Sequence, residues 1–338
     1  MGAGFGFDRQ TFGFPNNSRK KTHDSSMRKS CVLFIIAALI LSAAGLRFFP
    51  SVNSSSDMRT DGKFSSDFCG GKVFLSEESV SAEGKPLPAI MYHSVNKANI
   101  GDYVVHPSEL ERDFRNVKKL GFTPIFAREA ADFVGKGFPL PEKPILITFD
   151  DGFYNNLSFV LPLLKKYGYK AVIAVVGSFT DKEKGQRQSD YYSNLNREQI
   201  KLLSESGFVE IADHTYDLHG FKNGRKGVCR KKGESFSAYR ELLLKDLAKN
   251  GELLLSACGK APTTFVYPYG AYSADTPEIL AEAGFGIALT CNETVSVLKK
   301  GCNPYLVGRF NRSGKADSDA FFAKLSREIE KARRRTDS

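Results

Sequence analysis

The chain has 338 residues, 41% of them hydrophobic and 25% charged, and this composition excludes a disordered or collagen-like protein. Its formal net charge of +10 raises the question of a nucleic-acid or acidic-polymer partner. The basic excess lies in three places: the first fifty residues, residues 220–237 and the last eight residues. The rest of the chain is slightly acidic, so we expect no nucleic-acid partner.

The N-terminal part has the pattern of an export signal. A basic region, residues 1–30, precedes an apolar segment at residues 31–49. The apolar run 31–46 would span about 24 Å as a helix, which is short for a bilayer core of roughly 30 Å. The basic flank and the small residues 42–44 favour a secretory signal, with an uncleaved membrane anchor or a buried helix as alternatives. We therefore expect an extracytoplasmic protein, either secreted or anchored to the membrane by residues 31–49.

Residues 50–85 are rich in Ser, Gly, Asp and Lys and are expected to form a linker before a catalytic domain at residues 86–338. The six cysteines show no CxxC spacing, which argues against a zinc ribbon. Cys291 and Cys302 flank an expected loop and could form a disulfide after export.

Strands and helices alternate from residue 86 onward. The expected strands are 88–95, 144–149, 170–176, 208–212, 264–267, 286–290 and 305–310. The expected helices are 109–120 with Ser108 as its cap, 153–167, 196–206, 237–258, 276–283 and 320–333. This α/β alternation predicts a parallel sheet, either closed into a barrel or open and doubly wound. In both architectures the functional residues follow the carboxyl ends of the strands.

Two adjacent carboxylates, Asp150 and Asp151, follow the apolar strand 144–149 and precede Gly152. Burying both is costly unless a cation or a proton is shared between them. One carboxylate can then bind a metal ion while its neighbour faces a substrate. Taken alone, an Asp-Gly sequence is also typical of a surface turn.

Two of the five histidines, His214 and His219, follow the strand 208–212. Together with Asp151 they form a ligand set suited to Zn²⁺ or a similar divalent ion, with one position left for water. The alternative is a pair of unrelated loop histidines.

Two further strand ends carry candidate residues. The turn Tyr267, Pro268 and Tyr269 can direct a backbone N–H at an oxyanion while a ring lines the site, although this is also a common turn composition. His93 ends the first strand, a position where a lone histidine is more often structural.

The segments 148–152 (TFDDG), 214–219 (HTYDLH) and 265–270 (FVYPYG) together resemble the polysaccharide deacetylases, carbohydrate esterase family 4 with the NodB homology domain. The resemblance covers residues 86–312 and implies a distorted (β/α) barrel. It implies a divalent metal ion, with zinc expected, held by the ligands Asp151, His214 and His219. It further implies Asp150 as general base, and the turn of Tyr267, Pro268 and Tyr269 as the oxyanion and substrate-binding element.

Three features depart from the common family pattern. The histidines are one residue further apart than in HxxxH, Val266 stands where the third motif usually has arginine, and no histidine follows His219. The branch acting on poly-N-acetylglucosamine resembles this chain more closely, because its general acid is a histidine near the start of the domain. His93 matches that position. Arg309 could replace the lost arginine and orient the base.

We therefore expect a metal-dependent hydrolase that removes N-acetyl groups from a cell-envelope or extracellular polysaccharide containing N-acetylglucosamine. Its partners would be this N-acetylated polysaccharide and, if the N-terminal segment is uncleaved, the membrane. The missing late histidine leaves a catalytically silent carbohydrate-binding protein as an alternative. A phosphatase built on Asp150 and Asp151 would leave the histidine pair unexplained. The basic segment 220–237 is either a solvated insertion or a clamp for an anionic polymer.

Overall fold

The computed structural model describes residues 84–335. The predicted N-terminal regions 1–30 and 31–49 lie outside the described residues, as does the predicted linker apart from Gly84 and Lys85. Within residues 84–335, no helix is both long and apolar enough to cross a membrane.

Eight parallel strands form the main sheet, in the order β12-β11-β8-β7-β6-β2-β14, with β5 added beside β6. Their bounds are β2 Ala89–Tyr92, β5 Thr123–Pro124, β6 Pro144–Phe149, β7 Ala171–Val175, β8 Val209–Asp213, β11 Thr264–Val266, β12 Ile287–Leu289 and β14 Phe310–Asn311. Three short two-stranded pairs accompany it: β1 Lys85–Leu87 with β13 Ser296–Leu298, β3 Ser94–Val95 with β4 Val104–Val105, and β9 Phe221–Lys222 with β10 Arg225–Lys226. The predicted parallel α/β architecture is confirmed.

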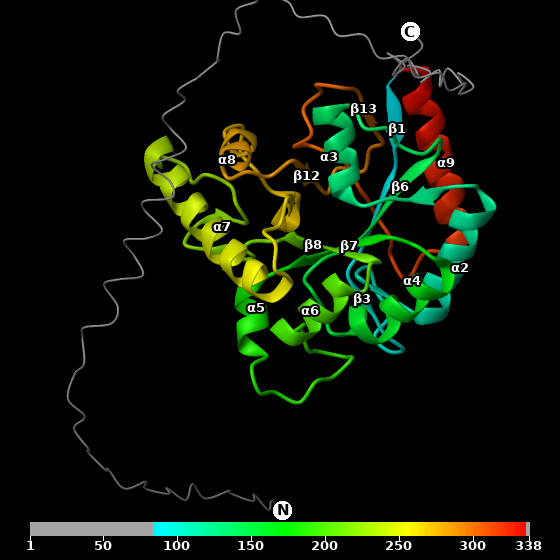
Figure 1. Ribbon diagram of the computed structural model, residues 1–338, viewed down its shortest axis with the longest axis horizontal. Helices are drawn as coiled ribbons and strands as arrows, with labels where there is room; N and C mark the ends of the chain where they lie inside the picture. Colours follow the sequence, from blue (N-terminus) through cyan, green and yellow to red (C-terminus); the bar gives the residue numbers. More distant parts are fainter. Residues whose placement is uncertain (1–83, 336–338) are drawn as a thin grey trace, which may run out of the picture. The chain divides into compact units, whose positions relative to one another are not determined.

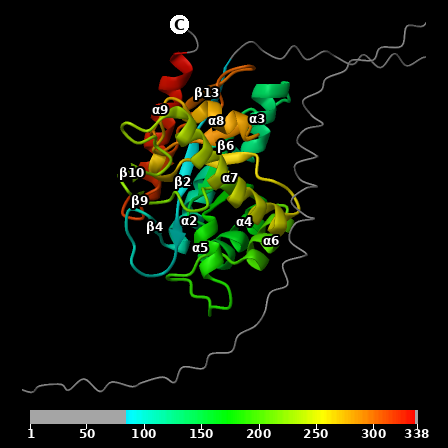
Figure 2. The ribbon, with the colours of Figure 1, turned by 90° about the vertical axis from the view of Figure 1, so that its left-hand side faces the viewer.

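Helices surround the sheet (Figures 1 and 2). They are α2 Pro107–Lys119, α3 Ala127–Lys136, α4 Leu161–Tyr167, α5 Gly177–Lys182, α6 Arg197–Glu205, α7 Phe236–Cys258, α8 Thr276–Glu282 and α9 Ser318–Arg334. A π-helical turn at Asn156–Val160 precedes α4, and a 3₁₀ turn at Pro268–Gly270 follows β11.

The two ends of the sheet approach each other through one segment. Leu289 of β12 forms a parallel bridge with Val307, and three residues later β14 pairs with β2 at the other end of the sheet. This short segment contacts both edges, so the sheet curves into a distorted barrel rather than the open, doubly wound alternative.

The core explains why the strands are apolar on both faces. All six residues of β6 are buried, and alternate side chains enter different clusters because strand side chains point to opposite faces. Ile145, Ile147 and Phe149 pack with α2, α4, α6 and α9, whereas Leu146 packs with α3. Side chains on both faces of the sheet therefore hold β6 in place.

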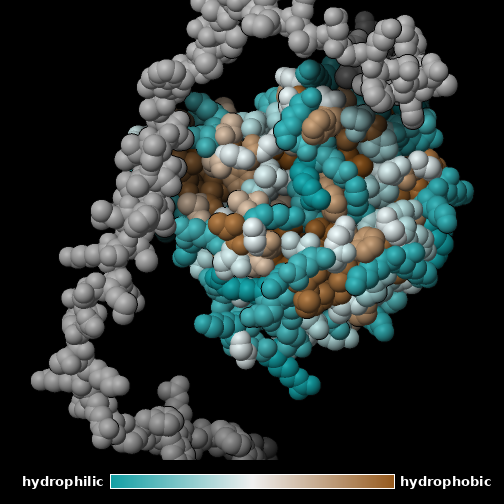
Figure 3. Space-filling view, viewed as in Figure 1, coloured by the Kyte–Doolittle hydropathy of each residue, from teal (hydrophilic) through white to brown (hydrophobic). Residues whose placement is uncertain are grey.

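Figure 3 shows hydrophilic residues around the edge of one face of the molecule, with smaller hydrophobic patches between them.

Several local predictions are corrected by the structure. His106 rather than Ser108 caps α2, because the His106 ring accepts a hydrogen bond from the Ser108 backbone N–H. The predicted helix 153–167 begins as a π-helical turn, and the predicted strand 305–310 is reduced to the bridge at Val307 and the short β14. The helices α3 and α5 were not predicted. Cys291 and Cys302, which were considered as a possible disulfide, are both free cysteines.

Candidate active site

A cavity of about 620 Å³ opens at the carboxyl ends of the parallel strands. Side chains that follow β2, β6, β8 and β11 line it, and they are His93, Asp150, Asp151, His214, His219 and Tyr269. Its size is that of an ordinary small-ligand site. The structure thus brings six of the predicted site residues into one cavity.

The turn after β6 places the two carboxylates. Asp151 and Gly152 both have left-handed backbone conformations, with φ of 68° and 62°. A Cβ on Gly152 would lie 3.3 Å from a Val175 methyl group, so a side chain there would be both strained and crowded. This tight turn keeps Asp150 on the face of β6 that carries Leu146, and turns Asp151 toward the histidines.

Asp151, His214 and His219 form a compact group whose potential ligand atoms all lie within 4.8 Å of one another. Oδ1 of Asp151 is 3.1 Å from Nε2 of His219 and 3.6 Å from Nε2 of His214. Two imidazoles and one carboxylate are the donor set of many zinc sites.

The protonation of His214 favours a cation at this group. Nδ1 of His214 lies 2.7 Å from the carbonyl oxygen of Val266, so Nδ1 carries the proton and donates it. Burial lowers the pKa of His214 to about 4, so the ring is neutral at pH 7 and its Nε2 presents a lone pair. That lone pair faces Oδ1 of Asp151, which is buried and has no hydrogen-bond partner. A divalent ion between these atoms satisfies both, and the residues therefore fit a metal.

His219 is positioned by aromatic rings. Its ring centroid lies 4.6 Å from that of Tyr269 and 5.7 Å from that of Phe179. The Tyr269 hydroxyl is 3.3 Å from Nδ1 of His219, on the side of the ring opposite the Nε2 that approaches Asp151. Such a partner on the second ring nitrogen fixes the orientation of a metal-binding histidine.

Asp150 is held by Arg309 in a buried, two-pronged ion pair. The guanidinium donates from Nη1 to Oδ1 at 2.7 Å and from Nη2 to Oδ2 at 2.8 Å, and both side chains are almost completely buried. Arg309 also donates to Thr148 Oγ1 and to the Thr290 carbonyl. Burial alone would raise the pKa of Asp150, but the charge and hydrogen bonds of Arg309 outweigh it and hold that pKa well below its usual range.

His93 lies in the wall of the same cavity, after β2. Its ring packs edge-on against Tyr103, with the centroids 4.7 Å apart, and its carbonyl oxygen accepts a hydrogen bond from the Asn156 side chain at 3.1 Å. Nδ1 of His93 is buried without a hydrogen-bond partner. The Tyr103 ring thus positions the His93 ring, and the Asn156 hydrogen bond holds the His93 backbone. Among the described residues, no group forms a hydrogen bond with Nδ1 of His93.

Only one residue of the third motif borders the cavity. Tyr269 is 41% exposed, lines the cavity and has a left-handed φ of 58°. Tyr267 is fully buried among aromatic side chains, and Pro268 is buried in the turn. Neither side chain lines the cavity, so of this predicted substrate-binding turn only Tyr269 borders it.

Sequence reasoning missed other lining residues, among them Met91, Tyr103, Cys291 and Asn311. Cys291 follows β12 by two residues, so the rule used for the other strand ends could have found it. Its Sγ lies 3.6 Å from Met91 Sδ and 3.8 Å from an Arg309 nitrogen.

The fold and this arrangement define a class of protein. Residues 138–288 match the family model described as polysaccharide deacetylase. The match covers the part of the chain that carries Asp150, Asp151, His214, His219 and Tyr269, and the family resemblance predicted from the sequence is confirmed.

Curated relatives agree with this class. Over 239 residues the chain is 28% identical to the poly-beta-1,6-N-acetyl-D-glucosamine N-deacetylase of Escherichia coli strain K12, a match covering 63% of this chain and 35% of that protein. It is 24% identical over 219 residues to the enzyme of the same name from Staphylococcus epidermidis, covering 61% of this chain and 72% of that one. The chain spans about a third of the length of the Escherichia coli relative.

Solved structures share the fold. IcaB from Ammonifex degensii matches with a TM-score of 0.59 and 26% identity, covering 72% of this chain and 97% of that one. The BpsB deacetylase domain from Bordetella bronchiseptica matches with a TM-score of 0.55 and 27% identity, covering 67% of this chain and 95% of that one.

Proposed function

We propose that this protein is a metal-dependent N-deacetylase of a cell-envelope or extracellular polysaccharide that contains N-acetylglucosamine. The observation that carries the proposal is the pairing of two differently held carboxylates. Asp151 faces two imidazoles without a hydrogen-bond partner on Oδ1, and Asp150 beside it is locked by Arg309. The relatives named as poly-beta-1,6-N-acetyl-D-glucosamine N-deacetylases support this substrate class.

Asp151, His214 and His219 would hold the divalent ion, and their two nitrogens and one oxygen suit zinc. When bound, such an ion acts as a Lewis acid and makes water a stronger nucleophile.

Asp150 is the proposed general base, accepting a proton from the attacking water. Because Arg309 keeps this carboxylate ionised, it is ready to accept a proton at any pH near neutrality. The same guanidinium makes Asp150 a weak base, so Asp150 readily releases the proton that it takes from water. Arg309 also fixes the direction of both carboxylate oxygens.

Tyr269 and His93 are the groups proposed to stabilise the carbonyl oxygen and to protonate the leaving amine. We assign the Tyr269 backbone N–H to the oxygen that becomes negative, since Tyr269 lies beside His219. We assign His93 as the acid, because it lines the cavity and its Nδ1 has no protein partner. Water adds its oxygen to the acetyl carbon and gives one proton to Asp150. Protonated His93 gives its proton to the amine nitrogen as the carbon–nitrogen bond breaks, and acetic acid leaves with the second water proton and ionises to acetate. Asp150 then releases its proton to solvent, and His93 takes one up.

The proposal includes an extracytoplasmic location, with residues 31–49 as signal core or membrane anchor. Its support is the basic and apolar sequence pattern alone. Fractionation of cells expressing the full chain tests it: we expect the protein outside the cytoplasm, and recovery in the cytoplasm would contradict it.

Acetate release from a β-1,6-linked N-acetylglucosamine pentamer tests the activity. We expect release by the wild-type protein loaded with Zn²⁺ and none by the His214→Ala variant. His106→Ala is the matched control, because His106 is a histidine that caps α2 and does not line the cavity. Glycan binding without acetate release by the metal-loaded protein would instead favour a silent carbohydrate-binding protein.

A further inference from the structure

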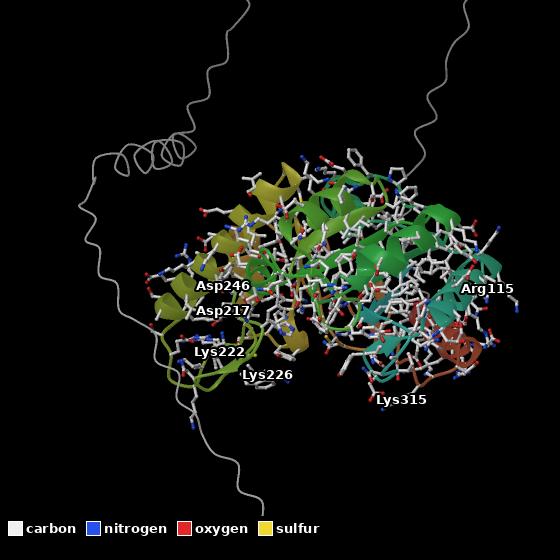
Figure 4. The ribbon with its side chains drawn as sticks, turned by 90° about the horizontal axis from the view of Figure 1, so that it is seen from below. Arg115, Asp217, Lys222, Lys226, Asp246 and Lys315 are labelled. Carbon is white, nitrogen blue, oxygen red and sulfur yellow. The ribbon has the colours of Figure 1, made fainter. Side chains whose placement is uncertain are left out.

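One lysine, Lys226, lies in the wall of the cavity. It belongs to β10, and no carboxylate of the described residues forms an ion pair with it. Figure 4 shows Lys226 on the segment that also carries Asp217 and Lys222. Its ammonium group is a positive charge that the described residues leave unbalanced.

Three other cations of the segment form ion pairs with carboxylates. Lys222 pairs with Asp217 at 2.7 Å, and Arg230 pairs with Asp275 at 2.8 Å. Arg225 is buried and binds Glu234. Three of the six basic residues in the segment 220–237 thus form ion pairs, Arg225 with a carboxylate of the segment and Lys222 and Arg230 with carboxylates outside it. Lys226 alone of its six basic residues lines the cavity.

The backbone on both sides of Lys226 is fixed. Arg225, the residue before Lys226, donates a hydrogen bond to the Cys229 carbonyl oxygen at 2.6 Å. Gly227, which follows, has a left-handed φ of 53°, and a Cβ there would lie 2.8 Å from the Pro268 carbonyl oxygen. Only glycine allows β10 to lie this close to the Pro268 turn. The contacts of Arg225 and Gly227 therefore hold the backbone of Lys226 in a defined position beside the site.

Aromatic rings connect this charge to the metal-binding group. Lys226 is the partner of Phe221 in the β9–β10 pair, and its Nζ lies 5.8 Å from the Phe221 ring centroid. The Phe221 ring is 4.9 Å from the Tyr269 ring, which in turn is 4.6 Å from the His219 ring. A sugar ring that packs on Phe221 would carry its substituents past the ammonium group while a neighbouring sugar reaches His219.

No charge inside the cavity is left to balance Lys226. Its lining carboxylates are Asp150, which is engaged by Arg309, and Asp151, which faces the two histidines. Contact with the Phe221 ring stabilises a cation but does not neutralise it. A carboxylate on a bound polymer would therefore meet the exposed Lys226 without competition from a lining carboxylate.

We infer that Lys226 is a specificity residue for a glycan that carries a negative charge, such as a carboxylate, on the sugar next to the acetamido sugar. This inference rests on the proposed N-deacetylase function of the same site. The same charge disfavours a neighbouring glucosamine, whose ammonium group it repels. Deacetylation would thus be spaced along a polymer rather than run through adjacent sugars.

The test uses four tetrasaccharides with the Zn²⁺-loaded full chain. They are neutral N-acetylchitotetraose, an alternating N-acetylglucosamine–N-acetylmuramic acid tetramer, an alternating N-acetylglucosamine–glucuronic acid tetramer, and a glucosamine tetramer with one acetyl group. The Kd is measured by calorimetry and kcat/KM by acetate release. The two carboxylated probes separate a lactyl from a uronic carboxylate. Variants are Lys226→Met and Lys226→Glu, with Lys232→Glu as the control, because Lys232 is exposed in the same segment and does not line the cavity.

At low salt we expect wild-type protein to prefer at least one carboxylated probe over the neutral one by about two- to fivefold, as for an exposed ion pair. The glucosamine probe should be disfavoured by a similar factor. Lys226→Met should abolish this order and Lys226→Glu invert it, whereas Lys232→Glu should retain it. An order unchanged in Lys226→Met, or a neutral probe preferred by wild type, overturns the inference. The expected order in Kd without acetate release would refute the proposed function and leave the charge preference standing.

Discussion

Arg309 and Arg312 lie three residues apart, and each is fully buried in an ion pair with an aspartate from a distant part of the chain. Arg309 binds Asp150, whose carboxylate borders the cavity. Arg312 binds Asp113 of α2, with Nε 2.9 Å from Oδ2, away from the cavity. The same type of pair thus occurs twice within one short segment.

The difference lies in what surrounds each carboxylate. Burial raises the pKa of Asp113 despite the opposing effect of Arg312, while Arg309 more than offsets burial at Asp150. Asp113 also accepts a hydrogen bond from the Tyr92 hydroxyl, so it connects α2 to β2, and Arg312 donates to the Ala316 carbonyl just before α9. Figure 1 shows α2 and α9 on the same side of the sheet. A buried ion pair therefore serves architecture in one case and, in our proposal, chemistry in the other, depending on access to the cavity.

The largest effect is expected for Asp150→Asn. A carboxamide fits the space but cannot accept the proton, so kcat should fall by about 10²- to 10⁴-fold. The matched variant Asp113→Asn should keep wild-type acetate release per folded molecule. Steady-state acetate release measures both. An Asp150→Asn protein within a few-fold of wild type would show that Asp150 is not the base.

The structural pair should be broken by Arg312→Met. This change leaves Asp113 buried without its cation, and the free energy of unfolding should fall by about 3–5 kcal/mol. Urea denaturation measures the loss, and acetate release per folded molecule should be unchanged. Wild-type stability in this variant would remove the architectural role assigned to Arg312.

A pH profile should separate Arg309 from Arg312. In Arg309→Gln the guanidinium is gone, and burial then raises the pKa of Asp150. Asp150 becomes protonated earlier as the pH falls, so the acidic limb of the kcat profile should move to higher pH, with the greatest loss of activity at low pH. Arg312→Met should retain the wild-type profile. Superimposable profiles for Arg309→Gln and wild type would contradict the proposed effect on Asp150.

The smallest effect is expected for Tyr269→Phe. It removes only the 3.3 Å contact between the hydroxyl and Nδ1 of His219, which is worth about as much as one ordinary hydrogen bond. Zn²⁺ affinity should fall by about two- to tenfold in a competition titration with a chelating dye. Tyr191→Phe is the control, since Tyr191 lines the cavity but is not in contact with His219. An equal fall in both variants would argue against orientation of His219 by Tyr269.

These comparisons also show what the sequence could predict. The apolar run of β6 determines where Asp150 and Asp151 lie, because the two charged residues follow a strand that is buried on both faces. The same reasoning correctly located His93 and His214 directly after strands and His219 in the loop that follows β8. Their shared edge follows from parallel pairing, without knowledge of any side-chain contact.

The remaining features depend on contacts between distant segments. The sequence suggests Arg309 only as a possible replacement for the missing arginine, because the ion pair between Arg309 and Asp150 joins residues 159 positions apart and forms only when the segment around Val307 closes the barrel. The ion pairs of residues 220–237 require partners outside the segment, such as Asp275, which composition cannot identify. Tyr267 and Tyr269 are two residues apart and would point to the same side of a continuous strand. The left-handed backbone at Tyr269 breaks this pattern, so the Tyr269 ring borders the cavity while the Tyr267 ring is buried.

The central claim is that one divalent ion, held by Asp151, His214 and His219, makes this domain a deacetylase. The most direct test is to strip the purified protein with a chelator and titrate Zn²⁺ back while following acetate release from the N-acetylglucosamine pentamer. Activity should rise from background and level off at one equivalent of metal per chain, and the His219→Ala variant should show no such rise. Full activity of the metal-free protein, or activity in His219→Ala equal to wild type, would contradict the claim.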